Sequence, residues 1–238
     1  MTTNELEELI KDNLETFYQR RLQRLSKLKL KDTLSKKNPY LFRAIGVQDA
    51  SDIVGGILQA YISSSDETIF GDAFFEPIAL AVSGGSVSPS EGVDVAIESE
   101  DIYKAISVKS GPNIFNSSQS KRQSDEFDTL RRRLVKLHKK FDPILGSAYG
   151  RKNSQATKTR SYRILSGQSF WEELTGDCDF YLKLIELMRD YPQKHRLLFQ
   201  EEYHKALNRF TKEFLDEFST EDGSINWTKL TKFNSGTT

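Results

Sequence analysis

The hydrophobic pattern of the chain changes period after residues 84–85, and this change constrains the fold more than any other feature. Val93, Val95 and Ile97 alternate with small or polar residues, and residues 102–109 repeat the alternation after a polar turn. Side chains of a strand point to opposite faces with a period of two. The two segments therefore predict a β-hairpin in a chain whose pattern is otherwise mostly helical.

The N-terminal part predicts a long amphipathic helix over residues 4–28. Thr2 and Glu5 have the spacing of a capping box at its start. Lysine and arginine dominate the stretch between residues 20 and 37, which we interpret as an exposed basic arm.

Two more helices are expected before the hairpin. One should start near residues 49–51, where Asp49 or Ser51 can cap it. The other should follow Gly71, with Pro77 in its first turn, where the missing N–H is tolerated.

Beyond the hairpin, the spacing predicts a helix over residues 127–141, short strands at 144–149 and 161–165, and helices from residue 168 onward, broken at Gly176 and Pro192. This order of elements predicts an α/β fold with a sheet of about four strands.

Composition excludes several classes of protein. No apolar run approaches the roughly 20 residues that cross a bilayer, and the acidic N-terminus does not resemble a secretory signal. A soluble intracellular protein is therefore expected. The single cysteine, Cys178, excludes an internal disulfide. His138, His195 and His204 lack the spacing of a structural zinc site.

The charges balance to zero but segregate along the chain. Residues 49–101 contain 11 acidic and no basic residues, whereas residues 102–163 contain 15 basic and 4 acidic residues. Such blocks usually form solvated faces. The alternative is a group of carboxylates that holds a cation, beside a basic wall that holds a polyanion.

Asp94 in the first hairpin strand and Lys109 at the end of the second are candidates for catalysis. Ser107 and Lys109 share a face of their strand, and Asp94 can approach that face. A carboxylate that holds Mg²⁺ and a lysine that orients or deprotonates water suit phosphodiester cleavage. A surface salt bridge is the other interpretation of this pair.

Residues 92–119, GVDVAIESEDIYKAISVKSGPNIFNSSQ, resemble the Asp and (Asp/Glu)-x-Lys core of the PD-(D/E)XK nuclease superfamily, in the KSGPN version of type II restriction endonucleases. Residues 162–186, with Gly-Gln-Ser-Phe-Trp before an acidic helical stretch, resemble a second segment of these enzymes. Within the superfamily, the chain looks closest to enzymes that cut short GC-rich palindromes of the GGNCC type.

The resemblance implies a restriction-endonuclease-like core, with a mixed sheet flanked by helices, in a single nuclease domain over residues 1–238. The implied parts are an N-terminal helix and basic arm (1–48), the catalytic core (49–167) and a helical C-terminal extension (168–238).

Carried over to this chain, the resemblance assigns Asp94 as the metal-binding aspartate and Lys109 as the catalytic lysine. Ser107 stands where the family has Asp or Glu. Because a hydroxyl is a poor Mg²⁺ ligand, we expect another carboxylate to replace the missing acid.

Glu76, on the helix before the hairpin, is the preferred replacement, although the helix dipole alone could favour an acid there. Glu126, on the following helix, is the alternative, and Glu98 fits a surface position on the strand. The expected catalytic residues are Asp94, Lys109, Glu76 and Ser107, and the expected metal-binding residues are Asp94, Glu76 and Val108.

The polar loop and basic segment after Lys109 offer amides, hydroxyls and cations, which are the groups that bind backbone phosphates. A plain linker is the alternative interpretation. The expected DNA-binding residues are Asn113, Asn116, Ser117, Ser118, Gln119, Lys121, Arg122, Arg151 and Lys152.

We therefore interpret the chain as an Mg²⁺-dependent endonuclease that cuts double-stranded DNA at a short palindrome. Cutting both strands of a palindrome implies a homodimer, and the resemblance implies the cytoplasm of a prokaryotic cell, with no membrane and no nucleotide cofactor. The alternatives are a structure-selective repair or junction nuclease, and a non-catalytic DNA-binding module that has lost a metal ligand.

Overall fold

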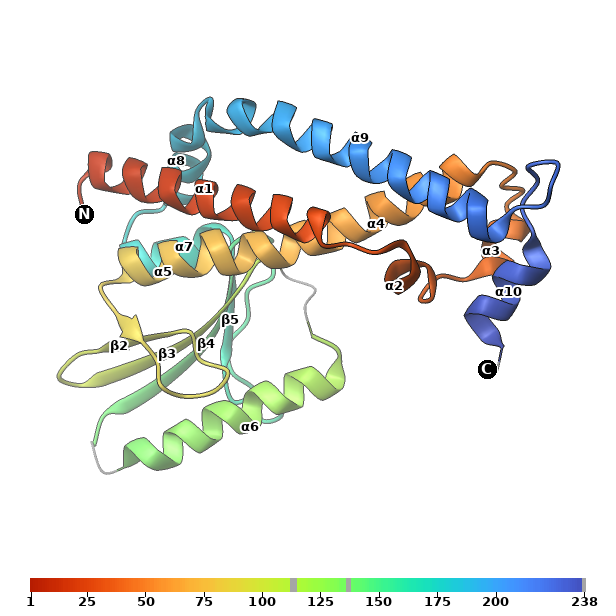
Figure 1. Cartoon of the computed structure of the whole chain (residues 1–238). Coiled ribbons are helices and arrows are strands. Elements are labelled where there is room, and N and C mark those ends of the chain that lie inside the picture. Colours follow the sequence, from red (N-terminus) through yellow and green to blue (C-terminus); the bar gives the residue numbers. More distant parts are fainter. Residues whose placement is uncertain (112–114, 136–137, 237–238) are drawn as a thin grey trace. The chain divides into compact units, whose positions relative to one another are not determined.

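A computed structural model of the protein describes residues 1–111, 115–135 and 138–236 (Figure 1). The chain forms two compact units, whose boundaries differ from the expected ranges 1–48, 49–167 and 168–238. The single nuclease domain over residues 1–238 stays a prediction. Unit 1 comprises Met1–Phe17 and Thr68–Tyr191, and unit 2 comprises Tyr18–Glu67 and Pro192–Thr238.

Helices make up most of the described chain, and α1 and α4 contribute residues to both units. In chain order they are α1 (Thr3–Ser26), α2 (Leu30–Leu34), α3 (Pro39–Ala44), α4 (Ala50–Phe70), the π-helical turn η1 (Gly71–Phe75), α5 (Glu76–Ser83), α6 (Ser117–Leu134), α7 (Gln168–Thr175), α8 (Phe180–Met188), α9 (Tyr191–Phe218) and α10 (Trp227–Ser235). The predicted capping box of α1 is present, with Thr2 N donating to Glu5 Oε2 over 2.7 Å. No described helix is both long enough and apolar enough to cross a membrane.

Unit 1 is built on a mixed sheet whose strands follow chain order: β1 (Ser86–Val87), β2 (Val95–Glu98), β3 (Ile102–Lys109), β4 (Lys140–Ser147) and β5 (Arg163–Ser166). The pairs β1–β2 and β2–β3 are antiparallel, and β3–β4 and β4–β5 are parallel. The predicted α/β fold and hairpin are confirmed, and the short strand β1 makes the sheet one strand larger than predicted.

Helix α6 connects β3 to β4 and lies along one face of the sheet, while α5 and α7 lie on the opposite side (Figure 1). Phe127 and Leu130 of α6 are buried together with Tyr103, Leu145 and Tyr162. Because β3 and β4 are parallel, the chain must return along α6 before β4 begins. The start of α6 therefore lies at the end of the sheet where β3 ends.

The predicted helix over residues 127–141 was wrong in its last turns. Helix α6 ends at Leu134, and β4 begins at Lys140, whose backbone N–H donates to Asp101 O over 2.7 Å. His138 has a positive φ of 54°, which leaves the helical path. Phe141 then packs beside Tyr103, with their ring centroids 6.4 Å apart, so the strand partly buries its ring.

Unit 2 has its own apolar core. Ala206, Phe210, Phe214 and Phe218 recur every four residues of α9, so they share one face, and they are buried in a cluster with apolar residues 53–58 of α4.

The stretch expected to be an exposed basic arm also contributes to the core of unit 2. Leu28, Leu30 and Leu34 are buried, while the lysines between them remain exposed. The expectation of an exposed basic arm was therefore wrong for its leucines, which anchor the segment to the core of unit 2.

Candidate active site

The candidate active site lies in unit 1, at the end of the sheet where β3 ends. Asp94 directly precedes β2, and Lys109 is the last residue of β3. Asp94 Oδ2 accepts a 2.6 Å hydrogen bond from the backbone N–H of Val108 and lies 3.5 Å from Lys109 Nζ. Both charged side chains are about one quarter exposed, at 28% and 26%. The hairpin therefore brings the predicted carboxylate and lysine together.

Ser107 supports Asp94 from the same strand. Its side chain is fully buried, and its Oγ donates to Asp94 Oδ2 over 3.5 Å. The position expected to carry an acid therefore supplies a neutral hydrogen-bond donor to the neighbouring carboxylate. Val108 is buried, and its N–H is used by Asp94, so its carbonyl is the atom that it could offer to a metal.

Glu76 is the first residue of α5, directly after the π-helical turn η1. Its backbone N–H donates to Gly71 O, five residues earlier, and Pro77 has no N–H to continue the regular pattern. Where the sequence predicted a new helix after Gly71, the structure has a single wide turn in an otherwise continuous helical path.

Gly71 allows this turn to approach the end of β3. A Cβ atom at Gly71 would lie 2.6 Å from Ser110 Oγ, so with a larger residue either this hydroxyl or the turn would have to move. Sequence reasoning missed this role of Gly71, for which the sequence signal is a glycine five residues before the candidate acid Glu76.

Burial and the neighbouring charges change the pKa of the Glu76 carboxyl group. Burial, reinforced by the negative charge of Asp94, raises the pKa of Glu76 to about 7, while Lys109 lowers it and Asp72 raises it. The negative charges of Asp94 and Glu76 therefore repel each other in a partly buried region, and a bound cation would relieve this repulsion.

The residues present fit Mg²⁺, which proteins commonly hold through one or two carboxylates plus substrate phosphates. Among the described residues, no group of three or more His, Cys, Asp and Glu side chains could hold a metal ion. The candidate ligands are therefore the pair Asp94 and Glu76, with oxygen atoms from the backbone and the substrate completing the set.

The other two acids have partners elsewhere. Glu126 lies 2.8 Å from Arg122 on α6, and its carboxylate packs against Gly92, where a Cβ atom would lie 1.8 Å from Oε2. Glu98 pairs with Lys139 at 2.6 Å, which agrees with its expected surface role. These ion pairs favour Glu76 as the replacement acid.

The start of α6 carries several of the expected DNA-binding residues. Asn116 and Gln119 form a capping box, in which each side-chain oxygen accepts a 2.9 Å bond from the other residue's backbone N–H. Ser117 and Ser118 are exposed in the first turn. Asn113 lies outside the described residues.

The four cations that were expected to bind DNA differ in whether their charge is already paired within the protein. Lys121 is exposed on α6, whereas Arg122 pairs with both Glu91 at 2.6 Å and Glu126 at 2.8 Å. Arg151 and Lys152 are exposed shortly after β4, whose last residue lies opposite Lys109 in the sheet. The exposed cations therefore reach the same end of the sheet as the candidate active site.

A network of four charged side chains holds α7 on the sheet. Arg163 lies 2.6 Å from Asp142 and 3.2 Å from Glu173, and Glu173 lies 2.6 Å from Lys104. Burial acts to raise the pKa of Glu173, but hydrogen bonds from Lys104 and Arg163 outweigh burial and lower it.

Replacing Glu173 by alanine should lower the free energy of unfolding by about 1–3 kcal/mol at pH 7, because two partly buried cations lose a partner. The pKa of folded Glu173 lies below its ordinary value of 4.5. Its contribution is therefore present above that value and is lost as the pH falls through the folded pKa. Urea unfolding at pH 7 and pH 3 measures both effects.

The control is Glu172→Ala, which removes an exposed neighbouring acid that makes no ion pair within the described chain. An equal loss of stability in the two variants would contradict the role of the network.

Comparison with known proteins finds a match over most of the chain. The family model of the type II restriction endonuclease EcoO109I matches residues 4–196. The matched range includes Glu76, Asp94 and Lys109, together with α6 and the Gly-Gln-Ser-Phe-Trp segment. No curated protein matches the chain.

Proposed function

Because the chain belongs to the family of the type II restriction endonuclease EcoO109I, and is therefore a site-specific deoxyribonuclease, we propose that Asp94, Lys109 and Glu76 form its active centre. One observation carries this proposal: the Asp94 carboxylate meets Val108 N–H and Lys109 at the hairpin end, and the charges of Asp94 and Lys109 act on the partly buried Glu76. The family match favours this function over a repair nuclease or a non-catalytic module.

Mg²⁺ is the proposed cofactor, with Asp94 and Glu76 as its carboxylate ligands and the backbone carbonyl of Val108 as a further ligand. When bound, it supplies Lewis-acid stabilisation of the phosphate and a water of lowered pKa. Lys109 orients the attacking water and offsets the charge that develops on the phosphate. The water oxygen bonds to phosphorus as one ester P–O bond breaks. Ser107 keeps Asp94 in position through its hydrogen bond.

The proposed substrate is double-stranded DNA with a short palindrome of the GGNCC type. A homodimer matches the two-fold symmetry of such a site and supplies one active centre for each strand. The place of action is the cytoplasm of a prokaryotic cell, without a membrane or a nucleotide cofactor.

The proposed phosphate and base contacts come from two segments at the same end of the sheet. The start of α6 and its N-cap contribute Asn116, Ser117, Ser118, Gln119, Lys121 and Arg122, and the segment after β4 contributes Arg151 and Lys152. Asn113, which lies outside the described residues, is proposed as a further contact from the sequence alone. Lys121, Arg151 and Lys152 are exposed and can meet phosphates directly. Arg122 must first exchange its pairs with Glu91 and Glu126.

Plasmid cleavage tests the proposal. We expect the purified protein to cut supercoiled DNA with Mg²⁺ and to stop when a chelator is in excess, because the carboxylate pair needs a cation to act. Ca²⁺ should support binding without cutting. Sequencing of the fragment ends should give one palindromic sequence. Efficient cutting in chelator would contradict the metal mechanism, and ends of mixed sequence would contradict a defined recognition site.

A further inference from the structure

Unit 2 contains a hollow whose charged lining residues are all cations except one. Its volume is about 450 Å³, and it is formed only by residues of α1, α2, α4 and the segments that flank α2. The lining residues are Arg24, Lys27, Leu28, Lys29, Asp32, Thr33, Lys36, Lys37, Ala60, Tyr61 and Ser64. None of them belongs to the proposed active centre.

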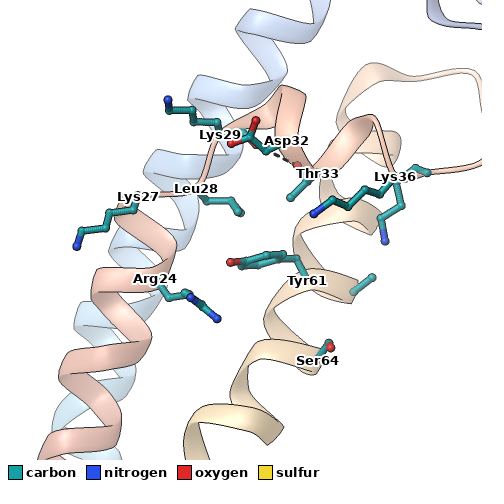
Figure 2. Close-up of a pocket in the computed structure, with 11 residues that line it drawn as sticks. Arg24, Lys27, Leu28, Lys29, Asp32, Thr33, Lys36, Tyr61 and Ser64 are labelled. Carbon is teal, nitrogen blue, oxygen red and sulfur yellow. Dashed lines mark hydrogen bonds between the residues drawn. The ribbon is translucent and has the colours of Figure 1, made fainter. Parts of the chain in front are cut away.

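Figure 2 shows how the polar side chains lie around this hollow. Arg24 on α1 and Tyr61 on α4 extend toward each other, and Lys36 extends toward α4 from the segment after α2. Tyr61 and Ser64 are three residues apart on α4 and therefore share a face. The hollow is thus surrounded by hydrogen-bond donors that come from three separate segments.

The five cations of the hollow, Arg24, Lys27, Lys29, Lys36 and Lys37, share their lining with one acid, Asp32. Within the described part of the chain, none of the lysines or the arginine that line the hollow forms an ion pair, and Asp32 is its single acid. Nearby cations in the same unit do pair: Arg21 lies 2.8 Å from Asp66, and Lys31 lies 2.6 Å from Glu217. Like charges gathered without partners attract a counter-anion from solution.

The backbone that carries these cations is held in place. Thr33 Oγ1 donates to Leu30 O over 2.8 Å and is buried with Leu28 beneath the charged side chains. Asn234 of α10 donates to Leu34 O at 2.7 Å and to Lys37 O at 2.8 Å. The cations are therefore presented from a fixed segment, which lowers the ordering cost of binding an anion.

We propose that this hollow binds a backbone phosphate of duplex DNA, as a contact additional to those at the catalytic end of unit 1. Phosphate oxygens only accept hydrogen bonds, and the rim offers ammonium, guanidinium and hydroxyl donors. DNA is the polyanion that a member of this family meets, so the proposal rests on family membership and not on the assignment of the active centre.

Fluorescence anisotropy with the full chain tests the proposal. The probe is a duplex without a GGNCC-type sequence, titrated in chelator over a series of salt concentrations, so that no cleavage is needed. We expect Arg24→Gln combined with Lys36→Gln to weaken binding about tenfold and to reduce the log-log salt slope by about 0.9 for each phosphate contact that is lost. Urea unfolding should give the parent midpoint, since both residues are exposed.

The matched control is Lys212→Gln combined with Lys229→Gln, which removes the same charge from exposed sites of unit 2 outside the hollow. The control should keep the parent slope. An unchanged slope in the first variant, or an equal change in both variants, would overturn the proposal. Calorimetry with pyrophosphate distinguishes a DNA phosphate from a small anion. If Arg24→Gln combined with Lys36→Gln loses pyrophosphate binding but keeps the parent's salt slope for the duplex, the hollow is a small-anion site. This result would also overturn the proposal.

Discussion

Replacing Asp94 or Lys109 by alanine will reduce plasmid cleavage by at least about a hundredfold, the effect typical of removing one charge-stabilising group from an active site. Asp94 lies 3.5 Å from Lys109 Nζ and accepts the Val108 N–H at 2.6 Å, so both side chains act at one point. Neither is needed to contact base edges. We therefore expect affinity for DNA to stay within a few-fold of the parent.

The matched control for Lys109→Ala is Lys140→Ala. Lys140 is exposed and lies opposite Ile102, at the other end of the same pair of strands. It should leave the cleavage rate unchanged. Retention of more than a few per cent of the parent rate by Asp94→Ala or Lys109→Ala would mean that the active centre is elsewhere.

Glu76→Gln should separate activity from stability. The amide is a weaker metal ligand than a carboxylate, so we expect cleavage to be lost as completely as in Asp94→Ala. The same change should stabilise the metal-free protein at pH 8, because it removes the negative charge that burial and Asp94 disfavour.

The sign of the stability effect follows from linkage. The folded pKa of Glu76, about 7, lies above its ordinary value of 4.5, so stability is greatest below 4.5 and is lost as the pH rises through 7. A pKa shift of this size corresponds to at most about 3 kcal/mol in the free energy of unfolding. Because Glu76 is only half-buried and solvent screens its charge, the expected gain is about 1–2 kcal/mol. Urea unfolding in chelator should show this gain at pH 8 and a smaller one at pH 5.

Three companion variants identify the replacement acid. Ser107→Ala should keep most of the activity, and Glu126→Gln should have a mild effect, because Glu126 is already paired with Arg122. Moving the acid back to the strand, with Ser107→Glu in the Glu76→Ala background, should restore part of the lost rate. Normal cutting by Glu76→Gln, or a complete loss in Glu126→Gln, would return Glu126 as the metal ligand.

The sequence predicted the hairpin well because its alternation is strict and its turn is polar. The hairpin register then determines that Asp94 and Lys109 meet, so this part of the candidate site could be predicted from local pattern. The resemblance to nucleases named the same residues, and the family match confirms that class of enzyme.

The parts that were predicted wrongly depend on tertiary structure. Phe141 continues the helical spacing of Leu134, but it lies on a strand because Tyr103 offers a partner on the sheet. The change of path occurs at His138, which has a positive φ. Histidine adopts this conformation more often than most residues, but still rarely, so its presence alone does not predict the turn. Local pattern cannot reveal where a ring will be buried.

The position of Glu76 also depends on long-range structure. Pro77 signals an irregular turn, but the approach of Gly71 to Ser110 is a contact between residues 39 positions apart, which periodicity cannot encode. The basic stretch of unit 2 was mistaken for an arm for the same reason: its buried leucines and its tether from Asn234 belong to the folded unit.

The most direct test of the central claim is a crystal structure of the protein grown with Ca²⁺, which should bind without supporting cleavage. We expect one ion bonded to carboxylate oxygens of both Asp94 and Glu76, at the Ca²⁺–oxygen distances of about 2.3–2.6 Å found in proteins. An ion bonded to Asp94 without Glu76, or held by Glu126 instead, would contradict the account.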